Sequence, residues 1–159
     1  MVARARQPAA LLARRDLRLA VAEGSTGGAL AAALTAVPGS SQWFDLAVVA
    51  YSNSSKERLL GVSSALLDQH GAVSLQVAEA MARGVLAISN ARLALAETSV
   101  LGPGGGRAQQ PVGSAWLVCQ LRDGEGRSAG YRFEGGREAV RTAIVGAALE
   151  LITSVAGEL

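Results

Sequence analysis

Lys56 is the single lysine of the chain, in which Lys and Arg together number 15. A lysine ammonium group can lose its proton when it is desolvated and then act as a base, whereas an arginine guanidinium group stays charged. Tyr51 precedes Lys56 at the end of an apolar run, so both side chains would lie at the edge of a sheet where ligands bind. Lys56 is therefore a candidate base. A solvated lysine beside a core tyrosine is the alternative.

The segment Ala22-Glu-Gly-Ser-Thr-Gly-Gly28 separates an apolar run from an Ala/Leu-rich run, which predicts a strand, a tight loop and a helix. Ser25 or Thr26 is expected to cap this helix. The backbone N–H groups of Thr26, Gly27 and Gly28 are expected to bind a phosphate or carboxylate, because a helix N-terminus attracts anions and glycine lets a ligand approach. A plain turn, in which the glycines serve geometry alone, is the alternative.

A second glycine-rich segment, Ser99 to Gly106, follows another predicted strand, and the two loops could face one another across a crevice. Arg137 and Arg141 lie one helical turn apart and could clamp an anion. A mobile surface loop and two solvated arginines are the alternatives. The predicted substrate-binding residues are Glu23, Gly24, Thr26, Gly27, Gly28, Thr98, Ser99, Gly102, Gly104, Arg137 and Arg141.

The elements that must position these groups follow from the apolar periodicity and the turn residues. Strands are expected at Leu17–Glu23, Asp45–Tyr51, Leu93–Thr98, Gly113–Leu121 and Gly126–Glu134. Helices are expected over residues 1–16, at Ala29–Ala36, from a cap at Asn53 to Gly61, at Ser63–His70, from a cap at Ser74 to Ile88, and from Arg137 to about Val155. This order predicts a single three-layer α/β domain over residues 1–159, with a mixed sheet and helices on both faces.

Composition excludes several classes of protein. Half of the residues are apolar and 18% are charged, which argues against disorder, and no unbroken apolar run of 18 residues indicates a membrane span. The net charge of +2 and the scattered arginines do not indicate nucleic-acid binding. One cysteine, Cys119, and one histidine, His70, argue against an internal disulfide and a metal site. No cofactor is expected. A cytoplasmic protein is expected, and an apolar helical face and a hairpin near Asp123 suggest a homodimer.

Six blocks of the sequence resemble the CinA C-terminal domain family in order and spacing, over about residues 11–151. The blocks are Ala22-Glu-Gly-Ser-Thr-Gly-Gly28, Pro38-Gly-Ser-Ser-Gln-Trp-Phe44, Tyr51-Ser-Asn-Ser-Ser-Lys56, His70-Gly-Ala-Val-Ser74, Gly102-Pro-Gly-Gly105 and Pro111-Val-Gly113. Members of this family include nicotinamide-nucleotide amidohydrolases, which hydrolyse the carboxamide of nicotinamide mononucleotide (NMN) to the acid and ammonia. The family also occurs fused to an N-terminal pyrophosphatase-type domain, which is not expected here.

The resemblance implies a site in which a hydroxyl nucleophile is assisted by Tyr51 and Lys56. Gly24 occupies the position of the family's nucleophilic serine, and Ser25 stands where the family has cysteine. The resemblance therefore implies an amidohydrolase of an NMN-like nucleotide, with Ser25 as the displaced nucleophile and catalytic roles for Lys56 and Tyr51. Water activated by Lys56 is a second route. An inactive nucleotide-binding or partner protein on the same fold is the alternative function.

Overall fold

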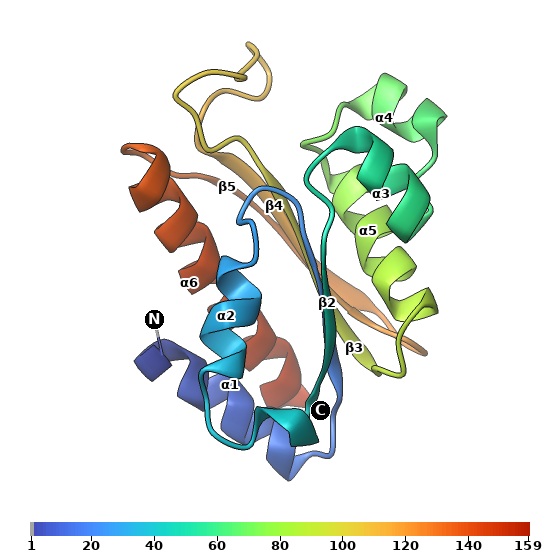
Figure 1. Ribbon diagram of the computed structural model, residues 1–159, viewed down its shortest axis with the longest axis vertical. Coiled ribbons are helices and arrows are strands. Elements are labelled where there is room, and N and C mark those ends of the chain that lie inside the picture. The colour runs from blue at the N-terminus through green and yellow to red at the C-terminus, as the bar shows by residue number, and fades with distance from the viewer. Residues whose placement is uncertain (1) are drawn as a thin grey trace.

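The computed structural model describes residues 2–159, in which a five-stranded sheet lies between two layers of helices (Figure 1). The strands are β1 (Leu19–Glu23), β2 (Phe44–Val49), β3 (Leu93–Ser99), β4 (Ser114–Leu121) and β5 (Gly126–Arg132). The helices are α1 (Val2–Arg14), α2 (Ala29–Thr35), α3 (Asn53–Leu60), α4 (Ser64–His70), α5 (Leu75–Ala87) and α6 (Arg137–Glu158), with a 3-10 turn η1 (Ser40–Gln42). The predicted three-layer α/β fold with a mixed sheet is confirmed. The predicted first helix corresponds to α1, while Met1 lies outside the described residues.

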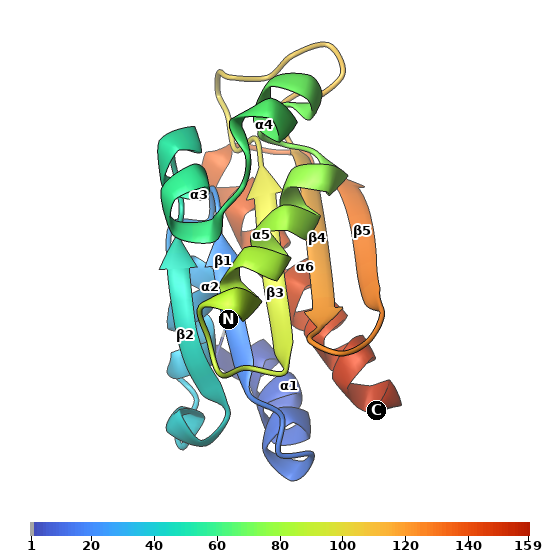
Figure 2. The ribbon, with the colours of Figure 1, turned by 90° about the vertical axis from the view of Figure 1, so that its right-hand side faces the viewer.

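The strands follow the order β2-β1-β3-β4-β5 across the sheet (Figure 2). β1 pairs in parallel with both β2 and β3, because helical crossovers connect these strands. β3, β4 and β5 pair antiparallel, and the last two strands form the predicted hairpin. The carboxyl ends of β1, β2 and β3 therefore meet at one edge, with β1 between two strands whose crossovers cover opposite faces. Ligands bind in this type of crevice in open α/β sheets.

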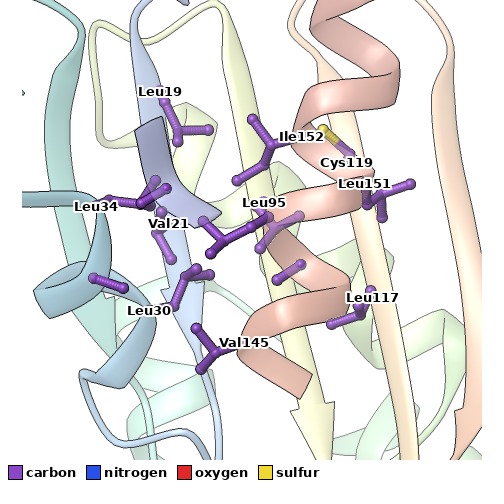
Figure 3. Packing of buried hydrophobic residues seen from close by; sticks show 14 of the residues in the cluster. Leu19, Val21, Leu30, Leu34, Leu95, Leu117, Cys119, Val145, Leu151 and Ile152 are labelled. Carbon is purple, nitrogen blue, oxygen red and sulfur yellow. The ribbon is translucent and has the colours of Figure 1, made fainter. Parts of the chain in front are cut away.

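β1 and β3 have nearly the same pattern, Leu-Ala-Val-Ala-Glu and Leu-Ala-Leu-Ala-Glu, in direct register. The larger apolar side chains point toward α1, α2 and α6, where Leu19, Val21 and Leu95 pack with Ile152 (Figure 3). The alanines point toward α3, α4 and α5, and their small side chains let α5 pack closely on the sheet. Because side chains alternate along a strand, the glutamates that end each pattern continue the leucine face.

The N-cap of helix α3 (Asn53–Leu60) lies one residue before the predicted cap. Ser52, rather than Asn53, is the N-cap, because its hydroxyl accepts the N–H of Ser55 while the Ser55 hydroxyl accepts the N–H of Ser52. This reciprocal pair is a capping box. Ser74 caps α5 as predicted, with its hydroxyl accepting the N–H of Val77.

Helix α6 is long and apolar enough to cross a membrane by length and composition alone, with a mean hydropathy of 1.5. However, 61% of the apolar window is buried inside the fold. Val140, Ile144 and Ile152 are among its fully buried residues and pack in the layer that covers the leucine face of the sheet. The apolar character of α6 is therefore that of a core helix.

Candidate active site

A cavity of about 260 Å³ lies at the edge where the parallel strands end. The loop after β1 and the loop after β3 both line it, so the two glycine-rich segments share one crevice. Its lining residues are Gly24, Ser25, Tyr51, Asn53, Lys56, Ala72, Val73, Thr98, Ser99, Val100, Leu101, Gly102, Gly104, Gly105 and Arg137. The cavity thus combines hydroxyl groups, one amine and one guanidinium.

Glu23 holds the N-terminus of α2 from inside the protein. Its fully buried carboxylate accepts the backbone N–H groups of Gly28 at 2.9 Å, Leu30 at 3.1 Å and Ala31 at 2.9 Å. These groups are the ones that a helix leaves unpaired at its start. The predicted cap by Ser25 or Thr26 is therefore wrong: Gly28 is the N-cap, no side chain at that position caps the helix, and Glu23 satisfies its N–H groups.

Of the three N–H groups predicted to bind an anion, those of Thr26, Gly27 and Gly28, two are already engaged inside the protein. The Thr26 N–H donates to Glu97 at 2.8 Å, and the Gly28 N–H donates to Glu23. Two carboxyl groups of the protein accept these N–H groups, which were expected to bind a phosphate. Gly27 is exposed and, like Thr26 and Gly28, does not line the cavity. The φ angles of Gly27 (66°) and Gly28 (94°) show that these glycines serve the turn itself.

Glu97 is a second buried carboxyl group, directly beside Glu23 in the sheet. The Thr26 hydroxyl bridges the two, with its Oγ1 at 2.6 Å from Glu23 Oε2 and 2.6 Å from Glu97 Oε1. Burial raises the pKa of Glu97 above its ordinary value of 4.5. Hydrogen bonds from Thr26 and Ser99 oppose this rise, and the negative charge of Glu23 adds to it. The environment therefore favours a neutral Glu97.

Ser25 and Ser99 connect the buried carboxyl groups to the cavity. Their hydroxyl groups are hydrogen-bonded to one another, and they lie at 3.3 Å and 3.2 Å from Glu97 Oε2. The adjacent Thr98 points to the opposite face of the sheet and donates to the carbonyl of Ala72 at 2.7 Å. Among the residues that line the cavity, Ser25 and Ser99 thus carry hydroxyl groups within hydrogen-bond distance of a potential acid or base, and that group is the carboxyl of Glu97.

Lys56 lies in α3 with only 3% of its surface exposed. Its Nζ donates to the backbone carbonyls of Ala50 at 3.0 Å and Tyr51 at 3.2 Å. Burial lowers the pKa of Lys56 below 10.5, and the charge of Glu97 opposes this change. Within residues 2–159 no hydrogen bond joins Lys56 to Ser25, so the two groups line the same cavity without touching.

Arg137 closes one side of the cavity. Its guanidinium donates to the carbonyl of Gly102 at 2.7 Å and to the Tyr51 hydroxyl at 2.9 Å, so it links the end of β2 to the loop after β3. Arg141 instead pairs with Glu138 and does not line the cavity. The predicted clamp of two arginines is therefore not formed, because one guanidinium is already neutralised by its neighbour on the same helix.

Gly24 lies against the backbone of β3. Its N–H donates a hydrogen bond to the backbone carbonyl of Glu97 at 3.0 Å. A Cβ atom at this position would lie 3.0 Å from that carbonyl oxygen and 3.4 Å from Thr98 Cα. A side chain here would require β3 to shift by a few tenths of an ångström. Glycine at position 24 therefore allows the backbone at the end of β1 to lie this close to β3.

Sequence reasoning missed Glu97. The matching patterns of β1 and β3 contained the signal, because each strand ends its leucine face with a glutamate and the two strands are neighbours. It also missed a larger cavity of about 490 Å³ at the opposite edge of the sheet, lined in part by Arg14, Arg15, Arg92 and Arg122. Hydrogen bonds to backbone carbonyls engage two of these arginines, Arg15 and Arg122. Among its lining residues that cavity has no side-chain hydroxyl, thiol or amine.

The fold and the site together define an α/β domain with a hydroxyl, amine and carboxyl site at the carboxyl edge of its parallel strands. The model of the CinA C-terminal domain matches residues 3–156. The chain is 48% identical over 142 residues to nicotinamide-nucleotide amidohydrolase PncC of Pseudomonas putida, covering 87% of this chain and 86% of that protein. It is also 48% identical over 143 residues to a CinA-like protein of Geobacter sulfurreducens, covering 89% of this chain and 34% of that protein.

Solved structures agree with these sequence relationships. The structure of the competence/damage inducible protein CihA from Agrobacterium tumefaciens superimposes with a TM-score of 0.94 at 39% identity, over 97% of this chain and 94% of that chain. The chain therefore belongs to the CinA C-terminal domain family.

Proposed function

We propose that this protein hydrolyses the carboxamide of NMN, or of a closely related pyridine nucleotide, to the carboxylic acid and ammonia. The observation that carries this proposal is the presence of a serine hydroxyl and a desolvated lysine amine in the lining of one cavity. The relatives named nicotinamide-nucleotide amidohydrolase support the same reaction class.

In this proposal Ser25 is the nucleophile. Its hydroxyl is half-buried, lines the cavity and is hydrogen-bonded to Ser99 and Glu97. Lys56 serves the leaving group: a buried lysine that loses its proton can exchange protons with departing ammonia at neutral pH. Its location in the same cavity, with both hydrogen-bond acceptors on the backbone, keeps the amine fixed near the carboxamide.

Arg137 and Tyr51 form the proposed binding site for the nucleotide phosphate. The Arg137 guanidinium lies at the rim of the cavity and is not paired with a carboxylate within the described chain. A guanidinium can bind a phosphate through two parallel hydrogen bonds. Gly102, whose carbonyl accepts from Arg137, and Gly104 line the same cavity, and their lack of side chains allows a ligand to approach the backbone. The sequence alone predicted a phosphate site at the N-terminus of α2. The site proposed here lies instead at Arg137 and the loop after β3.

A nucleotide-binding protein without turnover is the second candidate. The observation in its favour is that Lys56 donates to two carbonyls and makes no hydrogen bond to a hydroxyl group in residues 2–159. A Ser–Lys pair of the usual kind is thus not assembled in the ligand-free protein.

Release of ammonia from NMN distinguishes the two functions. The wild type is expected to release ammonia, and Ser25→Ala is expected to lower kcat by about 10³-fold or more while nucleotide affinity changes little. Ser54→Ala, at an exposed serine of α3, is the matched control and is expected to keep full activity. Binding of NMN measured by calorimetry without any ammonia release would support the second candidate. Equal ammonia release by wild type and Ser25→Ala would contradict Ser25 as the nucleophile.

A further inference from the structure

The contacts of Thr26 fix the number of protons between the two buried glutamates. Thr26 Oγ1 lies 2.6 Å from an oxygen of each carboxyl group, which is a hydrogen-bond distance in both cases. A threonine hydroxyl supplies one proton and a carboxylate supplies none. Two hydrogen bonds therefore need one further proton, which one of the carboxyl groups must carry.

The surroundings of the two carboxyl groups decide where this proton lies. The Glu23 oxygens accept three backbone N–H groups at the start of α2, which is an arrangement that stabilises a carboxylate. Glu97 accepts a single backbone N–H, from Thr26. Of the described residues, the charged groups that face Glu97 are Glu23 on β1 and Lys56 on α3. Burial and the charge of Glu23 both favour the neutral form of Glu97.

A proton on Glu97 Oε1 that is donated to Thr26 Oγ1, together with the Thr26 proton donated to Glu23 Oε2, satisfies both contacts. Glu97 Oε2 is left as a pure acceptor, at 3.3 Å from Ser25 Oγ and 3.2 Å from Ser99 Oγ. An unbroken chain of hydrogen bonds thus leads from Ser25, at the cavity, to the carboxylate of Glu23.

We propose that Glu97, Thr26 and Glu23 form a proton relay that acts as the base for Ser25; this inference rests on the proposed hydrolase function. It assigns a role to Glu97 and a new role to Glu23, in place of the Lys56 amine that does not touch Ser25. Glu97 lies in direct contact with the nucleophile, while Thr26 and Glu23 act through it.

The relay accounts for each proton and electron pair of the reaction. When Ser25 Oγ bonds to the carboxamide carbon, the carbonyl electron pair moves to oxygen and the Oγ proton moves to Glu97 Oε2. The Oε1 proton of Glu97 moves to Thr26, and the Thr26 proton moves to Glu23. The negative charge passes from Glu23 to the tetrahedral oxyanion. Collapse of this intermediate breaks the C–N bond and reverses the relay, and the Lys56 amine passes the returned proton to the amide nitrogen, which leaves as ammonia.

Hydrolysis of the resulting ester uses the same chain. Water adds to the ester carbon, and its proton reaches Glu97 Oε2 through Ser99, which is hydrogen-bonded to both Ser25 and Glu97. Breaking of the C–O bond returns a proton to Ser25 Oγ by the reverse path. The products are the carboxylic acid and the free serine.

The first test detects the proton without any substrate. Infrared spectra of the ligand-free wild type and of Glu97→Gln at pH 7 are subtracted, and the carbonyl band of a protonated carboxylic acid is expected in the wild type alone. This band shifts in deuterium oxide, which identifies it. A difference spectrum that holds only carboxylate bands would overturn the relay, whatever the protein's activity.

The second test measures the reactivity of Ser25 with a fluorophosphonate, which serine hydroxyls displace at phosphorus with loss of fluoride. Labelling of the Ser25 peptide is followed by mass spectrometry, so it does not depend on the natural substrate. Glu97→Gln and Thr26→Val are expected to lower the labelling rate about 100-fold or more, as loss of a general base does. Thr26→Ser keeps the hydroxyl and is expected to retain the rate within a few-fold.

These outcomes separate the relay from the proposed function. Labelling that depends on Glu97 without ammonia release from NMN would retain the relay and reject NMN hydrolysis. Ammonia release together with labelling that is the same in wild type and in a folded Glu97→Gln variant would retain the function and overturn the relay. Melting temperatures of the variants establish that each is folded. If Thr26→Val does not fold, the infrared comparison of the wild type with Glu97→Gln still tests the relay.

Discussion

Glu97 occupies a place on the leucine face of β3 where the pattern would otherwise put a third apolar side chain. A buried carboxyl group costs stability unless it is neutral or well hydrogen-bonded. Glu97 meets both conditions, because its raised pKa favours the protonated form and Thr26, Ser25 and Ser99 supply its partners. A neutral Glu97 also removes the charge that opposes deprotonation of Lys56. The two groups thus favour each other's neutral form.

The raised pKa of Glu97 predicts how the stability of the protein depends on pH. A raised pKa means that folded Glu97 retains a proton that the unfolded chain releases above about 4.5, so folding binds a proton in this window. The contribution of Glu97 to the free energy of unfolding is fully present below pH 4.5 and decreases as pH rises through the pKa of Glu97 in the folded protein. Chemical denaturation at a series of pH values is expected to show this decline in wild type and a flatter profile in Glu97→Gln. Glu57→Gln, at an exposed position, is expected to follow the wild type. Parallel profiles for wild type and Glu97→Gln would contradict a protonated Glu97.

Sequence patterns identified most candidate residues but not their partners. Lys56 was recognisable as the single lysine, and the structure shows it buried at the cavity as a base would need. Glu97 was missed because a glutamate at a strand end looks solvated when the strand is considered alone. Its burial depends on register with β1, and register is a property of the pair of strands.

Among the elements, α2 shows most clearly how sequence and structure differ. A glycine-rich turn before a helix predicts a site for an external anion, but the preceding strand supplies its own carboxylate through Glu23. The strand and helix themselves were predictable from periodicity, because their apolar faces are regular. Which group satisfies the helix N-terminus was not, since it depends on the path of a side chain from β1 back to α2.

Close packing of α3 on α5 gives a prediction at the same scale. Replacing a helical glycine by alanine usually stabilises a protein by about 0.5–1 kcal/mol. At Gly84 in α5, however, a Cβ atom would lie 2.0 Å from the carbonyl oxygen of Leu60. Gly84→Ala is therefore expected to lower the free energy of unfolding by more than about 1 kcal/mol, as overpacking does. Thermal and chemical denaturation measure this change.

Gly157 in α6 is the matched control, because no atom lies within 4 Å of a Cβ built there. Gly157→Ala is expected to leave the melting temperature unchanged or raise it. Equal effects at the two positions would show that helix propensity, rather than contact between α3 and α5, governs the response.

In the whole molecule, the two ends of the sheet differ in chemistry. The carboxyl edge of the parallel strands holds the hydroxyl, amine and carboxyl groups, while the amino edge gathers arginines from distant parts of the chain. These arginines are scattered along the sequence, and their proximity in the fold could not be predicted from their spacing alone. Arg122 donates to the carbonyls of Leu86, Ser89 and Ala91. One of these arginines therefore binds carbonyl groups at and just after the C-terminus of α5. The expected homodimer stays a prediction.

The layer order and the mixed sheet were predictable because turn residues and apolar runs are local signals. The site was only partly predictable, because it joins groups separated by more than 70 residues, such as Ser25 and Ser99. In the proposed function the reacting carboxamide lies beside these hydroxyls and the phosphate lies at Arg137, while Glu23 occupies the N-terminus of α2.

A crystal structure of Ser25→Ala with NMN tests this arrangement most directly, because this variant is expected to bind the substrate without consuming it. The carboxamide is expected within hydrogen-bond distance of Ser99 or Lys56, with its carbon facing position 25, and the phosphate is expected on the Arg137 guanidinium. A nucleotide bound in the arginine-lined cavity at the opposite edge, or with its phosphate on the N–H groups of Thr26 and Gly28, would contradict the account.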